Sequence, residues 1–268
     1  MPATFGHSQL AQILGGCALS AILAIPTETQ AQGSFIGVGV GTGPDYDGSN
    51  DYDTIPLVFG QFDLGGSTLQ LRGLGARIEL PLSQRVTGGP VFRYRFGRDD
   101  DVSDVRVARL PNIDDAIELG GFLRFQTPLG ASQSTLGFAE VELLADVSDA
   151  HDGVIANLDF GISTRPSPRL GLSLSTNITF VNDNYADTNY SISAAGSAAS
   201  GLGVFNADGG LHAVGLSLRA NYQLTDQWGL VGIVSVQELL NDASDSPVVS
   251  VAGSSTQAVA GFGLTYSF

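Results

Sequence analysis

Apolar and polar residues alternate with a period of two along much of this chain. In the last eleven residues, 258–268, every even position is apolar, whereas the odd positions are mostly small or polar. A strand with this period has one apolar face and one polar face, and about ten residues are enough for a tilted strand to cross a bilayer. The run ends on an aromatic residue, Phe268, a familiar mark of bacterial outer-membrane barrels. The pattern favours a membrane-spanning strand, and a strand of a soluble β-sandwich is the alternative.

Alternating segments of this kind recur along the chain, and the connections between them alternate in length. The predicted strands are 33–42, 53–62, 67–73, 75–81, 88–97, 114–125, 132–144, 153–164, 169–180, 210–222, 228–238 and 255–268. Short, turn-rich connections are 62–66, 82–87, 126–131, 165–168 and 223–227, and long, polar connections are 43–52, 98–111, 145–152, 181–209 and 239–254. Short inner turns and long outer loops are typical of outer-membrane barrels, and a soluble sandwich does not explain the alternation.

The number of strands depends on one ambiguous position. Between Leu71 and Leu74 the apolar phase changes from odd to even, which indicates either a β-bulge or a tight turn at Gly73–Gly75. Only a turn keeps the short and long connections in step and makes the strand number even. We therefore expect an all-β fold, a transmembrane antiparallel β-barrel of about twelve strands over residues 32–268, with both termini periplasmic. Ten or fourteen strands are the alternatives.

Composition fits this fold and excludes other classes. Hydrophobic residues make up 43% of the chain, and no stretch approaches the ~20 continuous apolar residues of a spanning helix. A barrel needs no such stretch, because only alternate residues face lipid. The chain has 27 acidic residues against 12 basic ones, with no basic cluster, so we expect no nucleic-acid partner.

The amino end is predicted to be a secretory signal. Residues 13–25 form an apolar run, followed by Pro26 and by a small-x-small pattern that ends at Ala31. We therefore expect residues 1–31 to be a signal peptide and 32–268 to be the mature barrel, although no Lys or Arg precedes the apolar run. The only cysteine, Cys17, falls within the signal, so the mature chain needs no disulfide.

The strand phases place a set of charged residues inside the barrel. On the lipid face each would cost roughly 2–4 kcal/mol near the bilayer midplane. The lumen candidates are Arg77, Glu79, Arg93, Arg95, Glu118, Arg124, Glu140, Glu142, Asp159 and Arg219. Their mixed signs favour pairing across a narrow lumen, and a charged eyelet that selects solutes is the alternative.

Few residues offer catalytic or metal-binding chemistry. The mature chain has two histidines: His151, expected to be solvated in an acidic outer loop, and His212, expected at the rim or on the lipid side. The carboxylates Asp45 and Asp47, or the run 99–101, have the oxygen donors of a hard-cation site, but solvated acidic loops are the commoner case. We expect no catalytic residue, no cofactor and no metal.

Two outer-loop motifs carry a family resemblance. The first is the Tyr46-Asp-Gly48-Ser49 region, and the second, more specific one is Asp242-Ala243 followed by Ser246-Pro247. With these motifs the chain resembles the MltA-interacting protein (MipA/OmpV) family along essentially all of residues 32–268. It departs at Tyr190-Ser-Ile, where the family often has a Tyr-Gly-Val-like element.

The resemblance implies an outer-membrane barrel in contact with outer-membrane lipid and without established catalytic residues. Some members of the family are described as scaffolds that join a murein hydrolase to a murein synthase, so these periplasmic enzymes are the expected partners. A pore for small solutes and a surface adhesin are the alternatives.

The Asp242–Pro247 segment carries a structural prediction of its own. It lies just before the closing strand, Asp242 can accept backbone hydrogen bonds in a turn, and Pro247 keeps the preceding residue extended. We expect a fixed loop that folds against the barrel mouth, with Asp242 as the internal acceptor of the turn. An ordinary solvated loop is the alternative.

Overall fold

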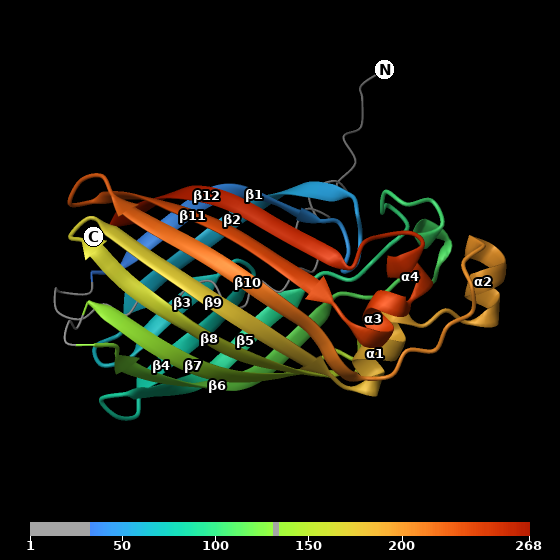
Figure 1. The fold of residues 1–268 in the computed structure, drawn as a ribbon, viewed down its shortest axis with the longest axis horizontal. Coiled ribbons are helices and arrows are strands. Elements are labelled where there is room, and N and C mark those ends of the chain that lie inside the picture. Colours follow the sequence, from blue (N-terminus) through green and yellow to red (C-terminus); the bar gives the residue numbers. More distant parts are fainter. Residues whose placement is uncertain (1–32, 131–133) are drawn as a thin grey trace, which may run out of the picture.

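The protein is a closed antiparallel barrel of twelve strands, shown by a computed structural model that describes residues 33–130 and 134–268 (Figure 1). Each strand pairs with its neighbours in sequence, and β1 pairs with β12 to close the barrel. The strands are β1 (Phe35–Pro44), β2 (Tyr52–Asp63), β3 (Thr68–Arg72), β4 (Gly75–Pro81), β5 (Val86–Arg95), β6 (Ala116–Pro128), β7 (Thr135–Asp146), β8 (Val154–Ser167), β9 (Leu170–Val181), β10 (Gly210–Gln223), β11 (Trp228–Leu239) and β12 (Thr256–Ser267). The predicted twelve-stranded barrel is confirmed, whereas the predicted signal peptide lies outside the described residues.

The short and long connections lie at opposite ends of the barrel. Phe35 at the start of β1 pairs with Ser267 at the end of β12, so both ends of the barrel chain meet at the short-turn end (Figure 1). The ambiguous phase change is a chain reversal, because β3 pairs antiparallel with β4 and Gly73 adopts a φ of 63° between them. Glycine tolerates this left-handed conformation without a steric penalty.

Helices form within the long connections, contrary to the expectation of irregular loops there. They are η2 (Val107–Arg109), α1 (Asp183–Tyr190), α2 (Ala194–Ser200), α3 (Asn241–Asp245) and α4 (Pro247–Ser250), and they gather at the long-loop end (Figure 1). The small residues of the low-complexity segment 193–203 indicate a loop from sequence alone, but the segment contains α2. Its alanines favour helix, the Ser193 side chain caps the Gly196 N–H at 3.1 Å, and Gly201 ends the helix at a φ of 78°. No helix within the described residues is long and apolar enough to cross a membrane.

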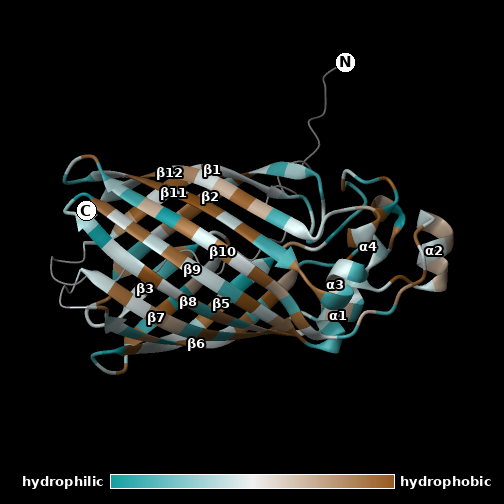
Figure 2. Cartoon of the chain, in the orientation of Figure 1, coloured by the Kyte–Doolittle hydropathy of each residue, from teal (hydrophilic) through white to brown (hydrophobic). Residues whose placement is uncertain are grey.

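The outer surface of the strands is apolar, with brown and pale positions alternating along them (Figure 2). Val38, Leu216 and Phe262, for example, are more than half exposed. An apolar surface of this kind is stable in contact with lipid. The backbone tolerates lipid as well, because closure of the sheet leaves no strand without a neighbour on either side.

The inner surface has two unlike halves. On β1, β2, β11 and β12 it is apolar, where Ile55, Leu57, Phe59 and Val231 pack into one buried cluster. In the sequence, Val231 departs from the alternation of its strand, and the reason is that its apolar side chain faces inward, against this cluster. Small residues on β1 and β12 make room for it: a Cβ at Gly37 would lie 2.1 Å from the Phe59 ring.

Candidate functional site

The other half of the lumen is a network of buried charges on β3 to β8 and β10. All ten charged residues predicted to line the lumen lie in this half. Arg77 is its centre, since its guanidinium contacts Glu79 at 2.5 Å and Glu140 at 3.0 Å. Glu140 also contacts Arg124 at 3.1 Å. Each carboxylate therefore offsets a guanidinium, as charges removed from water require.

A second chain of ion pairs runs toward the long-loop end. Glu142 contacts Arg93 at 2.5 Å and Arg72 at 3.8 Å, and Glu118 contacts Arg95 at 2.7 Å and Arg93 at 3.6 Å. The sequence reasoning missed Arg72, although the outward phase of its neighbours in β3 would have placed it inside.

The remaining two lumen candidates are also buried. Asp159 accepts a hydrogen bond from the Asn177 side chain at 3.2 Å, and Arg219 is 5% exposed on β10. Residues of opposite charge thus cross-link adjacent strands, such as β5 and β6, and strands further apart, such as β4 and β7, and they fill this half of the lumen.

Above the charged network, the long connections fold into a cap over the barrel mouth. We define the cap as residues 45–51, 96–115, 182–209 and 240–255. Its buried apolar core joins the first, second, fourth and fifth of the long connections, through Tyr46, Val107, Ile192, Leu202 and Val248. A second cluster ties Tyr185 and Tyr190 of α1 to inward-facing residues of the strands. The cap is therefore packed like a small domain core.

The residues of the first family motif hold the first outer loop against the last one. The N–H of Gly48 donates to Gln257 Oε1 at 3.3 Å, and the Gly48 carbonyl accepts from Ser254 N at 2.8 Å. Ser49 is fully buried, and its carbonyl accepts from Gln257 Nε2 at 3.0 Å. Gly48 has a φ of 99°, which explains a glycine at this position.

The second motif forms helices α3 and α4, which the cap buries. Ser246 is fully buried, and its Oγ donates to the Tyr190 carbonyl at 2.7 Å and accepts from Val248 N at 3.3 Å, which caps α4. Pro247 occupies the first turn of that helix, where no N–H is needed, and Ala243 is buried beside it. The segment is thus fixed against the mouth.

The expected role of Asp242 was wrong. Its Oδ2 accepts from the backbone N–H of Asp208 at 2.8 Å. This hydrogen bond links two long connections, whereas an internal acceptor would have bonded within its own turn.

Both histidines are buried beneath the cap, which corrects the expectation of solvated or lipid-facing side chains. His151 Nε2 lies 3.3 Å from Glu118 Oε1, and His212 Nε2 lies 3.4 Å from Asp47 Oδ2. The Tyr185 ring lies between the two imidazoles, with centroids 5.1 and 5.7 Å away. A register shift between Leu211 and Ala213 turns His212 inward, and the sequence periodicity gave no sign of this bulge.

Asp47 is likewise buried, not solvated in an acidic loop. Its Oδ2 accepts from Tyr190 Oη at 2.6 Å. Burial alone would raise the pKa of Asp47, but the hydrogen bonds from His212 and Tyr190 hold it below its usual value. Burial raises the pKa of Tyr190 well above its usual value, so the phenol stays protonated and donates.

Within residues 33–130 and 134–268, no group of three or more His, Cys, Asp or Glu side chains is arranged to hold a metal ion. His212 on β10 pairs with Asp47 of the cap, whereas His151 in the connection 145–152 pairs with Glu118 on β6.

Structural comparison finds many barrels of similar architecture. The whole chain of the NanC porin matches 87% of this chain, with a TM-score of 0.49 and 9% sequence identity. The translocator domain of the autotransporter NalP from Neisseria meningitidis matches over 90% of each chain, with a TM-score of 0.47 and 10% sequence identity. The toluene transporter TbuX of Ralstonia pickettii matches over 89% of this chain and 90% of its own, with a TM-score of 0.38 and 12% sequence identity. Nothing about function follows from likenesses this distant.

Comparison of sequences is more specific. No curated protein sequence matches this chain. The sequence profile of one family, described as MltA-interacting protein MipA, matches residues 36–268, which is the whole barrel from the first strand to the last residue. Given this match and the closed twelve-stranded fold, the chain belongs to the MipA family and is an outer-membrane β-barrel protein.

Proposed function

We propose that this protein is a non-catalytic scaffold whose short-turn end faces the periplasm and binds enzymes that process murein. The observation that carries the proposal is the closed long-loop end. The cap covers the mouth and the ion-pair network fills half of the lumen beneath it. The description of the family as MltA-interacting supports a partner of this class.

The short-turn end has the features of a docking surface. A shallow recess, largely open to solvent, lies there among β1 and β8 to β12, with Phe35, Asn221 and Thr265 on its wall. The exposed Arg165 and Arg169 flank the turn from β8 to β9 at its rim. Arginine is enriched at protein interfaces, since its guanidinium donates several hydrogen bonds in a fixed plane.

Charge separates the two ends of the barrel. Three arginines lie in or directly beside the predicted short turns, at positions 85, 165 and 169, with two aspartates at 63 and 226, whereas most of the 27 acidic residues lie in the long connections. An acidic partner is therefore attracted to the short-turn end and repelled from the cap.

The test is direct binding of the folded barrel to purified MltA in detergent, measured by biolayer interferometry. Replacing Arg165 and Arg169 together by Glu should weaken binding at least tenfold, whereas the matched change Arg109→Glu, on an exposed arginine of the cap, should leave it unchanged. Absence of binding by the native barrel, or equal weakening by both variants, would reject the proposal.

The pore alternative makes a different prediction. An open lumen gives stable single-channel conductance in planar bilayers, and replacing Arg93 or Arg95 would change it. We expect the native barrel to be silent, because both guanidiniums are held by Glu118 beneath the cap. Stable channels in the native protein would favour the pore.

A further inference from the structure

The barrel wall is lower at β3 and β4 than at the strands beside them. These two strands have five and seven residues, whereas their neighbours β2 and β5 have twelve and ten. Figure 1 shows both short strands toward the short-turn end. The pairing of β2 with β3 stops at Phe59, and the N–H of Gly73, in the turn between β3 and β4, donates to the Val58 carbonyl just beyond it. The wall is therefore incomplete above this turn.

Above the turn, the outer part of β2 has a partner strand on one side only. Residues 52–57 pair with β1 but with no second strand in the described structure. On the far side, the pairing of the turn with β5 ends where the N–H of Tyr94 donates to the Leu74 carbonyl at 3.2 Å. The second long connection closes the top, because the N–H of Ser103 donates to Asp45 Oδ2 at 2.9 Å. We call this part of the wall the wall window, bordered by residues 52–58, 73–74 and 94–97.

Polar backbone groups of β2 face the wall window. Successive residues of an antiparallel strand direct their N–H and C=O groups to opposite sides. Since the Val58 carbonyl faces β3, Thr54 and Pro56 face the same side, with one N–H and two carbonyls that none of the described backbone groups contacts. Proline has no N–H and is found in sheets on edge strands. Pro56 thus marks this edge as one that is protected against the addition of another strand.

The wall window lies at the depth of the outer leaflet. Val58, Leu74 and Phe92 surround its lower part, and each apolar side chain is more than a third exposed, as on the rest of the lipid-facing wall. Tyr52 and Tyr94 lie higher on β2 and β5, where barrels carry the aromatic girdle that faces the outer interface. Backbone groups without partners are costly in contact with lipid tails. The occupant must therefore be apolar along its length and also carry hydrogen-bonding groups.

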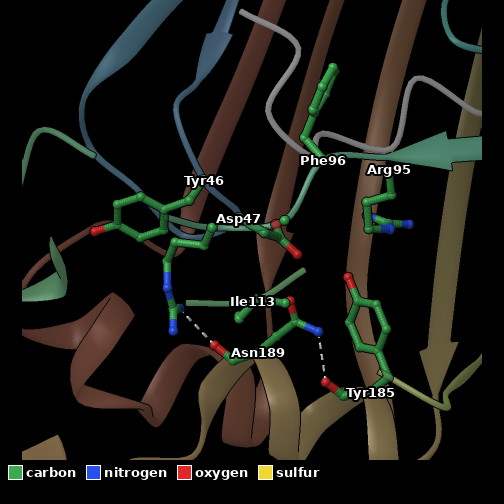
Figure 3. Close-up of a pocket in the computed structure, with 9 residues that line it drawn as sticks. Tyr46, Asp47, Arg95, Phe96, Ile113, Tyr185 and Asn189 are labelled. Atoms are coloured by element: carbon green, nitrogen blue, oxygen red, sulfur yellow. Dashed lines mark hydrogen bonds between the residues drawn. The ribbon is translucent and has the colours of Figure 1, made fainter. Parts of the chain in front are cut away.

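Side chains close the inner side of the wall window. Ile55 and Leu57 are buried in the apolar cluster of the lumen, and Arg95 is held by Glu118 at 2.7 Å. Figure 3 shows the Phe96 ring pointing away from Arg95, toward the outside of the barrel. The wall window is therefore a docking site on the outer surface and not a passage into the lumen.

We propose that the wall window binds an acylated glucosamine lipid of the outer leaflet, the lipid A part of lipopolysaccharide. One of its amide-linked hydroxyacyl chains lies along β2. The chain covers Val58 and Leu74, its hydroxyl and amide N–H donate to the Thr54 and Pro56 carbonyls, and its amide carbonyl accepts from the Thr54 N–H. A plain acyl chain offers none of these hydrogen bonds, and a peptide strand meets Pro56 where its ladder needs a donor. The site does not depend on the function proposed for the short-turn end.

Native mass spectrometry of the folded, full-length barrel in detergent tests this, with lipid A as the probe and phosphatidylglycerol as an anionic lipid whose acyl chains carry no amide or hydroxyl. We expect saturable binding of lipid A and weaker binding of phosphatidylglycerol. Thr54→Trp places a ring over the exposed edge of β2 and should weaken lipid A binding about tenfold or more, since one lost hydrogen bond alone accounts for about tenfold. Val214→Trp is the matched control, because Val214 is exposed on the outer face of β10, where the strand is paired on both sides.

Three results would overturn the proposal. They are no saturable binding of lipid A to the native barrel, equal lipid A affinity in the Thr54 and Val214 variants, and a dimer of the native barrel that Thr54→Trp dissociates while lipid A does not. The last result would assign the edge of β2 to a second copy of this chain. If Thr54→Trp does not fold, Thr54→Cys modified by a bulky maleimide after folding replaces it, since residues 32–268 contain no cysteine. Unchanged lipid A affinity in the modified protein would count equally against the site.

Discussion

Ser246 is the residue on which the closed state of the cap should depend most clearly. Changing it to Ala removes two hydrogen bonds of one buried hydroxyl group, one to the Tyr190 carbonyl and one from Val248 N. A buried carbonyl that loses its donor costs about 1–3 kcal/mol, and loss of a helix cap costs about 1 kcal/mol. We therefore expect the opening of α3 and α4 from the barrel mouth to become easier by about 2–4 kcal/mol.

Hydrogen exchange measured by mass spectrometry reports this opening directly. Since 1.4 kcal/mol corresponds to a factor of ten, amides of residues 246–253 should exchange about 30- to 700-fold faster in Ser246→Ala. The matched control is Ser244→Ala, because the Ser244 hydroxyl contacts only the exposed Asn241 carbonyl. Equal protection of these amides in the two variants would refute the assignment of Ser246 as the fastener of the cap.

Other predictions concern the ion-pair network, the contact between β1 and β12 that closes the barrel, the hydrogen bond between Asp242 and Asp208, and the effect of pH. Glu140→Gln leaves buried guanidiniums short of a partner and should destabilise the barrel by about 3–5 kcal/mol, seen as a lower unfolding temperature. Gly39→Val should prevent closure, because a Cβ there lies 2.2 Å from the Phe262 carbonyl oxygen, and the heat-modifiable gel band should disappear. Asp242→Ala should speed exchange around residue 208 at a cost of about 0.5–2 kcal/mol. Because folding lowers the pKa of Asp47, the ionised carboxylate stabilises the cap at pH values above the ordinary pKa of aspartate. This stabilisation is lost as the pH falls through the lower pKa that Asp47 has in the folded protein. Protease resistance of the cap should therefore persist at pH 5 and fall only below about pH 4, and a loss near pH 6 would contradict this reasoning.

Much of the barrel was predictable because its wall obeys one rule. Lipid on one side and a lumen on the other impose a period of two, so segments such as 258–268 show both their length and their phase in the sequence. The same rule placed Arg93 and Glu118 inside, where they pair.

The cap was not predictable in this way, because its contacts join residues far apart in the chain. Tyr190 meets Asp47 across 143 positions, and Gly48 meets Gln257 across 209. No local period reports such pairs. The bulge that turns His212 inward also breaks the periodicity on which the outward assignment was based. The alanines of 194–200 and the serine before them were the available signal for α2.

The division of the lumen into a charged and an apolar half bears on the order in which the barrel forms. The ion pairs join strands within one part of the chain, with separations of 23 residues for Arg95 on β5 and Glu118 on β6 and of 63 for Arg77 on β4 and Glu140 on β7. The glycine-rich seam of β1 and β12 instead joins the two ends of the chain. Contacts between residues close in the sequence cost little loop-closure entropy. The ion pairs of the charged half can therefore form first, while the sheet is still open. The pairing of β1 with β12 then closes the barrel last, when the charged side chains, which are unfavourable in lipid, are already in ion pairs.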